Sequence, residues 1–127
     1  MISFDAFVPV AGVPIYLQIL RQIQRGAAAG RIQNGDELPS RRVLSALLGV
    51  NPNTVQKAYR LLEEKGLISS HTGAKSCMVL SDETVQAIRQ ELLENEVRAL
   101  VTAMRQTGAS KTDALALVGK LWDECGV

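Results

Sequence analysis

The chain has few of the residues on which metal sites, disulfides and catalytic centres depend. Its 127 residues include two cysteines, Cys77 and Cys125, and one histidine, His71. The cysteines are far apart with no second cysteine or histidine nearby, so we expect buried free thiols rather than a zinc site or a disulfide. A lone histidine is a poor basis for catalysis. The sequence therefore predicts no metal and no other cofactor.

Long apolar runs are also missing. No stretch approaches the roughly twenty apolar residues that span a bilayer, and the opening MISFDAFVPVAGV lacks the basic start of a signal peptide. We therefore expect a cytoplasmic protein with no membrane partner. With 46% hydrophobic residues in 127, the chain can bury one modest core, and two full domains are not expected.

The charge is divided unevenly along the chain. The net charge is only +1, but residues 1–80 carry nine Lys and Arg against five Asp and Glu, whereas residues 81–127 carry five against eight. A basic first part suits the phosphate backbone of nucleic acid, and a module with so small an excess should bind tightly only as a dimer. We expect two parts, residues 1–80 and residues 81–127.

Residues 38–66, reading LPSRRVLSALLGVNPNTVQKAYRLLEEKG, predict two short helices joined by a tight turn. Ser40 is placed to cap the first helix, and Gly49 to end it. Asn51 followed by Pro52 is a typical start for the second. The apolar stripe expected on the first helix is Val43, Leu44, Leu47 and Leu48.

The second of these helices has an apolar and a polar side. Helical spacing predicts a core face of Val55, Ala58, Tyr59 and Leu62. The opposite side carries Asn53, Gln56, Lys57 and Arg60. Asn and Gln can pair with an adenine edge, and Arg and Lys can reach guanine or phosphate. Thr54 and the free N–H groups of the first turn suit a phosphate oxygen. A plain solvated face is the alternative, but the turn and the caps favour a helix-turn-helix that binds double-stranded DNA.

Two short apolar runs flank a polar tip between Leu67 and Leu80, which predicts a two-stranded hairpin. Such a hairpin must pack on the helices to be stable, as the wing of a winged helix does. Its candidate DNA contacts are His71, Thr72, Gly73 and Lys75. For His71, a phosphate contact and plain solvent exposure are both open.

Upstream, Pro14 followed by Ile15, Ile19 and Ile23 predicts a scaffold helix that ends near residues 26–30. The preceding residues 2–10 mix apolar and small side chains. They suit either a short strand or an arm laid across a partner subunit.

The last third predicts a helical hairpin: a long helix from Ser81 to about Gln106, a terminator at Gly108, and a last helix capped by Ser110. Its apolar stripes have nothing in the chain to cover them, so we expect pairing with a second copy. The dimerisation residues are Val85, Ile88, Leu92, Val97, Leu100, Met104, Leu117, Leu121 and Trp122. One alternative is that the hairpin folds back on its own winged helix. A small-molecule effector pocket at the dimer junction, lined by Trp122 and Met104, is a further hypothesis.

The predicted fold is therefore mainly α, with a winged helix-turn-helix DNA-binding domain followed by a C-terminal two-helix dimerisation hairpin. An enzyme is not expected, because Glu91, Glu94 and Glu96 have no histidine, nucleophile or glycine-rich phosphate cradle beside them. A winged-helix adaptor that binds proteins instead of DNA is the alternative function. The polar, basic face of the second helix argues against it.

Residues 14–68, from PIYLQI to KGLI, resemble the N-terminal winged helix-turn-helix of the GntR family of bacterial transcription regulators, and NPNTVQKAY is similar to its YtrA branch. By this resemblance Arg42 matches a DNA-contacting arginine, and Gly73 matches a wing-tip glycine. The family's wing often reads G-K-G-T-F-V, from which this chain departs. With the readers above, the DNA-binding set is Ser40, Arg41, Arg42, Asn51, Asn53, Thr54, Gln56, Lys57, Arg60, His71, Thr72, Gly73 and Lys75.

The resemblance further implies a homodimeric repressor whose two recognition helices lie about one DNA turn apart on a pseudo-palindromic operator. Its targets would be a nearby transporter operon, often of the ABC type, and its own gene. The short tail is similar to the YtrA type, which has no separate ligand domain.

Overall fold

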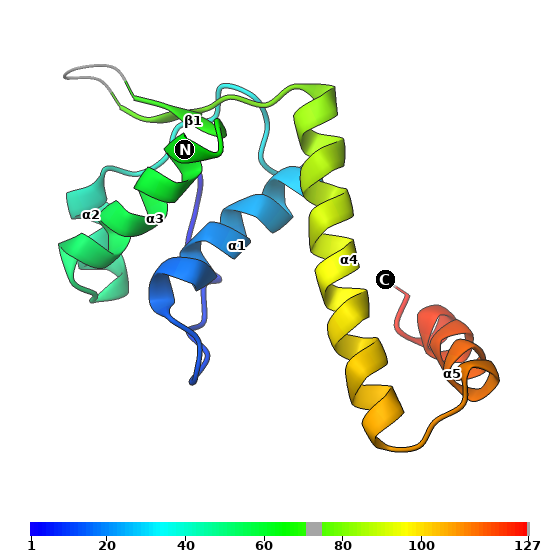
Figure 1. Ribbon diagram of the computed structural model, residues 1–127. Coiled ribbons are helices and arrows are strands. Elements are labelled where there is room, and N and C mark those ends of the chain that lie inside the picture. The colour runs from blue at the N-terminus through cyan, green and yellow to red at the C-terminus, as the bar shows by residue number, and fades with distance from the viewer. Residues whose placement is uncertain (71–74, 127) are drawn as a thin grey trace. The chain divides into compact units, whose positions relative to one another are not determined.

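The computed structural model describes residues 1–70 and 75–126 (Figure 1). These residues form five helices and two strands: α1 Ile15–Ala28, α2 Arg41–Leu48, α3 Pro52–Glu64, β1 Ile68–Ser69, β2 Cys77–Met78, α4 Asp82–Gln106 and α5 Lys111–Glu124. The chain divides into two compact units, Met1–Gln90 and Glu91–Val127. The fold is mainly helical, as predicted.

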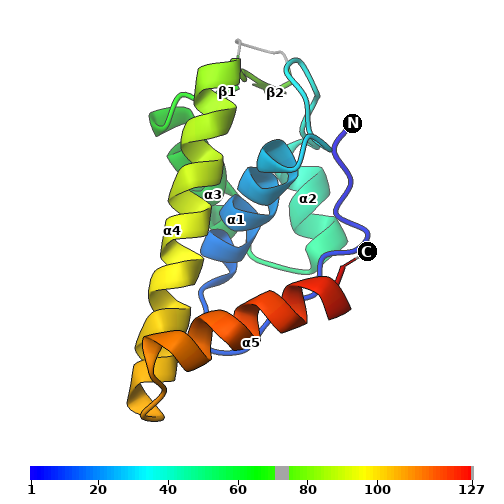
Figure 2. The same cartoon turned by 90° about the vertical axis from the view of Figure 1, so that its right-hand side faces the viewer.

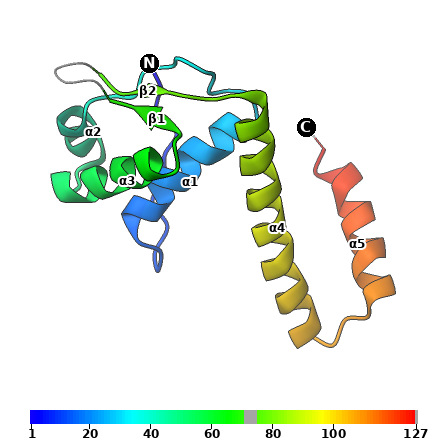
Figure 3. The same cartoon turned by 45° about the horizontal axis from the view of Figure 1, so that its top comes forward.

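The core of the first unit is centred on α3, which packs against both α1 and α2 (Figures 1 and 3). The predicted core face of α3 is confirmed, since its four residues are completely buried: Val55, Ala58, Tyr59 and Leu62. Ile19 and Ile23 of α1 are equally buried. The buried face of α3 leaves the opposite side of the helix to the solvent.

The predicted caps and turn between α2 and α3 are also confirmed. The Ser40 hydroxyl accepts a hydrogen bond from the Val43 N–H at 3.1 Å. Gly49 ends α2 with φ at 66°, a conformation that glycine adopts without strain. Asn51 caps α3, and Pro52 occupies its first turn.

The predicted apolar stripe of α2 is partly wrong. Leu44 is buried, but Val43 and Leu47 are 47% and 64% exposed. Ser45 is buried instead, and its hydroxyl donates a 2.5 Å hydrogen bond to the Val50 carbonyl in the turn. With eight residues, α2 has room for only a narrow inward face, and Leu44 and Ser45 form it.

The predicted hairpin is present in a short form. β1 pairs antiparallel with β2, with Ile68 opposite Met78. Glu37 adds an isolated bridge to Cys77, so the loop before α2 lies along the wing. The Ser70 and Ser76 hydroxyls, 2.7 Å apart, hydrogen-bond at the tip end of the pair. The predicted contacts His71, Thr72 and Gly73 lie outside the described residues.

The N-terminal segment packs on its own unit, and residues 2–10 form no strand, so the expectation of a short strand is wrong. The Ile2 N–H donates to the Glu37 carbonyl at 2.7 Å, and Ile2 and Phe4 are buried. The Gln18 side chain of α1 accepts from the Val10 N–H and donates to the Val10 and Val13 carbonyls. This segment therefore belongs to the core that supports α1 and the loop before α2.

The first unit extends to Gln90, further than the expected boundary after residue 80. Ile88 of α4 is 5% exposed, and the Arg89 guanidinium donates to the Ala28 carbonyl at 2.6 Å. The first turns of α4 are thereby fixed to the end of α1.

The second unit contains the rest of α4 and the whole of α5 (Figure 2). Gly108 lies in the turn that follows α4, with φ at 80°. The Ser110 hydroxyl caps α5 by accepting a hydrogen bond from the Asp113 N–H. The predicted helical hairpin is therefore confirmed. No described residue from Glu91 to Gly126 is buried. This unit consequently has no core of its own.

None of the described helices combines the length and the apolar character that crossing a membrane requires.

Candidate nucleic-acid interface

The exposed side of α3 carries the predicted readers together. Asn53, Gln56, Lys57 and Arg60 are all exposed, and Thr54 is half-buried at the edge of this side. The opposite face of the helix is locked in the core, so the helix cannot rotate to hide these side chains. Amides and a guanidinium on one exposed helical face can hydrogen-bond to the edges of base pairs.

The start of α3 has fewer free N–H donors for a phosphate than the sequence predicts. The Asn51 side-chain oxygen accepts from the Asn53 N–H at 2.8 Å, and the Asn51 carbonyl accepts from the Thr54 N–H at 2.9 Å. Pro52 has no N–H to donate. The prediction of free N–H groups in the first turn is therefore wrong at these positions, because the cap already satisfies them. The side-chain NH₂ group of Asn51 has no intramolecular acceptor among the described residues.

The start of α2 carries two arginines in different environments. Arg42 is exposed, as a DNA contact requires. Arg41 is half-buried, with its guanidinium carbon 5.1 Å from the centre of the Tyr59 ring. Its Nε is buried and has no hydrogen-bond partner among the described residues. Ser40 is exposed, but its oxygen is occupied by the cap.

Tyr59 connects the two helices of the helix-turn-helix. Its hydroxyl donates a 2.6 Å hydrogen bond to the Pro39 carbonyl, just before α2. Burial raises the pKa of the phenol, and the nearby Arg41 charge only partly opposes this effect. The phenol therefore stays protonated and keeps its role as donor. Sequence reasoning placed Tyr59 in the core but missed this bond, although a buried tyrosine hydroxyl calls for a partner.

Lys57 has a neighbour that the sequence analysis did not identify. Its Nζ lies 4.0 Å from the centre of the Tyr16 ring on α1. Tyr16 is half-buried, and Lys57 remains exposed. The packing of α1 on α3 brings the two together.

At the wing, Lys75 is exposed and its Nζ lies 3.4 Å from Glu37 Oε2. Both side chains are open to solvent, so this ion pair is weak. Lys75 can therefore exchange Glu37 for a phosphate at small energetic expense.

The predicted dimerisation residues differ in how far they are buried. Ile88 is buried within the first unit and adds little area to any interface, and Val85 beside it is half-buried. Leu92 and Met104 are half-buried too. The remaining members are exposed: Val97, Leu100, Leu117, Leu121 and Trp122.

An open hollow of 460 Å³ lies at the turn of the hairpin in the second unit. Its lining is mainly apolar and includes Val101, Met104 and Leu115, with Arg105 and Lys111 beside them. Met104 lines this hollow, whereas Trp122 is 76% exposed and does not. The expected effector pocket at the dimer junction stays a prediction.

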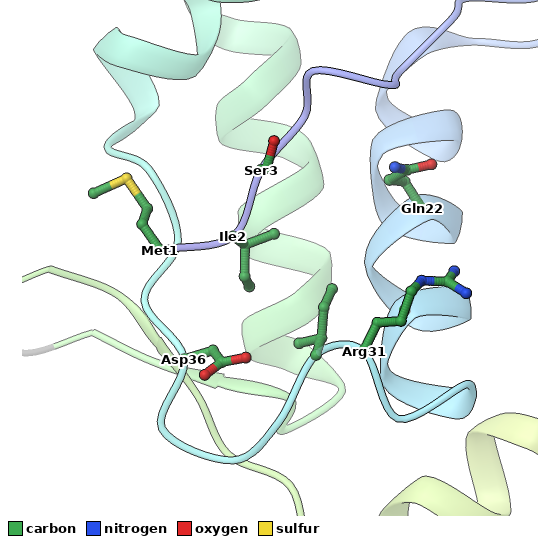
Figure 4. Close-up of a pocket in the computed structure, with 8 residues that line it drawn as sticks. Met1, Ile2, Ser3, Gln22, Arg31 and Asp36 are labelled. Carbon is green, nitrogen blue, oxygen red and sulfur yellow. The ribbon is translucent and has the colours of Figure 1, made fainter.

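A second hollow, of 310 Å³, lies between the N-terminal segment and α1 (Figure 4). It is bordered by Met1, Gln22, Arg31 and Asp36. The Asp36 carboxylate already accepts a 2.8 Å hydrogen bond from the Gln33 N–H. The described residues also contain no group of three His, Cys, Asp or Glu side chains able to hold a metal. The helix-turn-helix surface, by contrast, gathers amides and cations that suit nucleic acid.

Comparison with known proteins agrees with this site. The model of the bacterial regulatory proteins of the gntR family matches residues 15–76. YhcF, an HTH-type transcriptional regulator of Bacillus subtilis, is 31% identical over 102 residues, which cover 80% of this chain and 84% of the relative. The HTH-type transcriptional repressor YtrA of Bacillus subtilis is 42% identical over 73 residues, covering 58% of this chain and 54% of the relative.

A solved structure is similar over nearly the whole chain. A GntR family transcriptional regulator from Listeria monocytogenes superposes with a TM-score of 0.79 at 28% identity, covering 88% of this chain and 98% of that one. The resemblance seen in the sequence is thereby confirmed. The chain is a DNA-binding transcription regulator and not an enzyme. With its winged helix-turn-helix, its exposed reading face and these relatives, it belongs to the GntR family of bacterial regulatory proteins.

Proposed function

We propose that this regulator is a homodimeric repressor that binds a pseudo-palindromic operator in the cytoplasm and blocks access of RNA polymerase. The observation that carries the proposal is the exposed, polar face of α3 on a buried helix-turn-helix core. Each copy presents one such face. Two copies related by a twofold axis would set them about 34–36 Å apart, one turn of DNA.

The residues divide into base readers and phosphate contacts. Asn53, Gln56 and Arg60 occupy the exposed side of α3 and can hydrogen-bond to base edges in the major groove. Arg42 at the start of α2 and Lys75 in the wing are exposed cations suited to phosphates. Asn51 and Ser40 act as caps and position the readers. Arg41, held over Tyr59, adds positive charge beside them.

The exposed apolar side chains of the second unit support the proposal of a dimer. Most of this unit's large apolar side chains are 38–76% exposed, and none of those described is buried, so the unit has no stabilising core. Fully burying one Leu or Val side chain contributes about 1.5–3 kcal/mol. A second copy is the occupant we propose, because two identical hairpins can bury both stripes in one four-helix arrangement. The pseudo-palindromic operator requires the same twofold symmetry.

The sign of regulation follows the similarity to a repressor, and the regulated genes follow the resemblance to the YtrA branch. YtrA of Bacillus subtilis is named a repressor. By similarity to the YtrA branch, we propose that this chain represses a nearby transporter operon of the ABC type together with its own gene.

An effector would bind at the turn of the hairpin. The hollow there is apolar, and Arg105 and Lys111 border it, so an apolar anion would suit it. A shift of the melting temperature by such a compound, lost in Arg105→Ala, supports this part of the proposal. The absence of any shift across a panel of apolar carboxylates contradicts it.

A gel-shift titration of the full chain against its own upstream DNA, at two salt concentrations, tests the main proposal. We expect a discrete complex whose affinity falls as salt rises. Sedimentation of the free chain should give the mass of a dimer. A protein-interaction adaptor would show no discrete complex, and a hairpin folded on its own winged helix would sediment as a monomer. Either result overturns the corresponding part.

A further inference from the structure

Lys57 is the one cation on the exposed side of α3 that rests on an aromatic ring. Its Nζ lies 4.0 Å from the centre of the Tyr16 ring. No carboxylate among the described residues forms an ion pair with Lys57. The ring is therefore the feature of the fold that restrains this charge.

The position of Lys57 on α3 separates it from the base readers. Four residues after Asn53, it is turned by about 40° around the helix axis, whereas Gln56 and Arg60 are turned the opposite way. Tyr16 comes from α1, so Lys57 leans to the flank of the reading face on that side. A lysine at the edge of a face that enters the major groove is suited to the phosphates along the groove wall.

A free lysine side chain samples many rotamers, and fixing it on a phosphate costs conformational entropy. An aromatic ring within about 6 Å attracts the ammonium group and reduces the number of rotamers that the lysine samples before DNA binds. The packing of α1 on α3 fixes the ring itself, since Ile19 and Ile23 anchor α1 in the core.

We propose that Tyr16 is a positioning residue that holds Lys57 ready for a DNA phosphate beside the groove. The inference rests on the proposed function. It assigns a DNA-binding role to α1, which the sequence analysis treated as scaffold. Removing the ring should weaken operator binding by about two- to fivefold, the range typical of an exposed cation–π pair.

The same unit has a second pair of this type, Arg41 over Tyr59, but only the Tyr16 pair can be tested cleanly. Tyr59 is completely buried and its hydroxyl is bonded to Pro39, so its loss would disturb the fold. Tyr16 is half-buried, and its hydroxyl has no partner among the described residues. Tyr16→Phe therefore keeps the ring, whereas Tyr16→Leu removes it with little change in apolar bulk.

The experiment is a double-mutant cycle on the full chain, with operator affinity measured by fluorescence anisotropy. We expect Tyr16→Phe to bind like the parent and Tyr16→Leu to bind two- to fivefold more weakly. In a Lys57→Ala background, Tyr16→Leu should have no further effect. Equal binding by Tyr16→Leu and the parent, or an equal loss in both backgrounds, overturns the proposal.

A second measurement uses the parent chain alone, without variants and without DNA. In the NMR spectrum of the free parent chain, the ring should shift the Lys57 ε-methylene protons upfield of the other lysines. Unshifted protons overturn the inference. A chain that shows the upfield shift but binds no operator contradicts the proposed function and leaves the pair established, so the two failures are distinguishable.

Discussion

The Tyr59 hydroxyl donates a 2.6 Å hydrogen bond to the Pro39 carbonyl, twenty residues earlier in the chain. Tyr59 lies on the buried face of α3, and Pro39 is buried directly before α2. The bond therefore fixes where α2 begins relative to the reading helix. Arg41 and Arg42 follow Pro39 closely, so the same bond positions both arginines.

Tyr59→Phe tests this bond. It leaves the buried Pro39 carbonyl without its donor, which should lower the free energy of unfolding by about 1–3 kcal/mol. Urea denaturation followed by circular dichroism measures the change. Tyr16→Phe is the matched control, because the Tyr16 hydroxyl has no partner among the described residues. Equal stability of both variants would show that the bond contributes nothing.

Arg42→Ala should weaken operator binding several-fold and leave the melting temperature nearly unchanged. The side chain is exposed and makes no hydrogen bond or ion pair among the described residues, so its loss removes only a contact to DNA. Lys120→Ala removes one exposed positive charge from the second unit and serves as control. If the two variants bind DNA equally well, the assignment of Arg42 is wrong.

Gln56→Ala should change which operator sequence is preferred more than it changes the salt dependence of binding. Gln56 is uncharged and exposed on the reading face, so its loss releases no additional counterions. Competition among single-base operator variants measures the preference, and titrations at several salt concentrations measure the slope. An altered slope with unchanged preference would instead place Gln56 on the backbone.

Glu37→Gln should strengthen DNA binding about two- to threefold at low salt. The carboxylate pairs with Lys75 across 3.4 Å and would repel a phosphate approaching the wing. Because such exposed pairs contribute about 0.2–1 kcal/mol and are screened by ions, the gain should shrink at higher salt. Lys75→Ala should remove most of it. Weaker binding by Glu37→Gln would mean that Glu37 supports the wing rather than competing with DNA.

The helix-turn-helix was predictable because its signals are local. Ser40, Gly49 and Asn51 cap or end helices through bonds within a few residues, and the core face of α3 follows from helical spacing. The exposure of Val43 and Leu47 was not predictable, because it depends on how a short helix meets α3.

Contacts between distant segments could not be predicted from the sequence either, because they too depend on how separate elements pack. The pairs Lys57 with Tyr16 and Arg41 with Tyr59 join different helices, so no spacing rule reveals them. The hydrogen bond from Ile2 to Glu37 attaches the N-terminal segment to the first unit. The hydrogen bond from Arg89 to Ala28 attaches the start of α4 to the same unit. Each depends on tertiary packing that a single sequence does not encode locally.

The most direct test of the central claim is a DNase footprint of the full chain on its own upstream DNA. We expect two protected half-sites related by an approximate twofold axis, with centres about 10–10.5 base pairs apart, and loss of protection in Arg42→Ala at the same protein concentration. A single protected half-site, or protection that Arg42→Ala leaves unchanged, would contradict a dimer that reads DNA through this face.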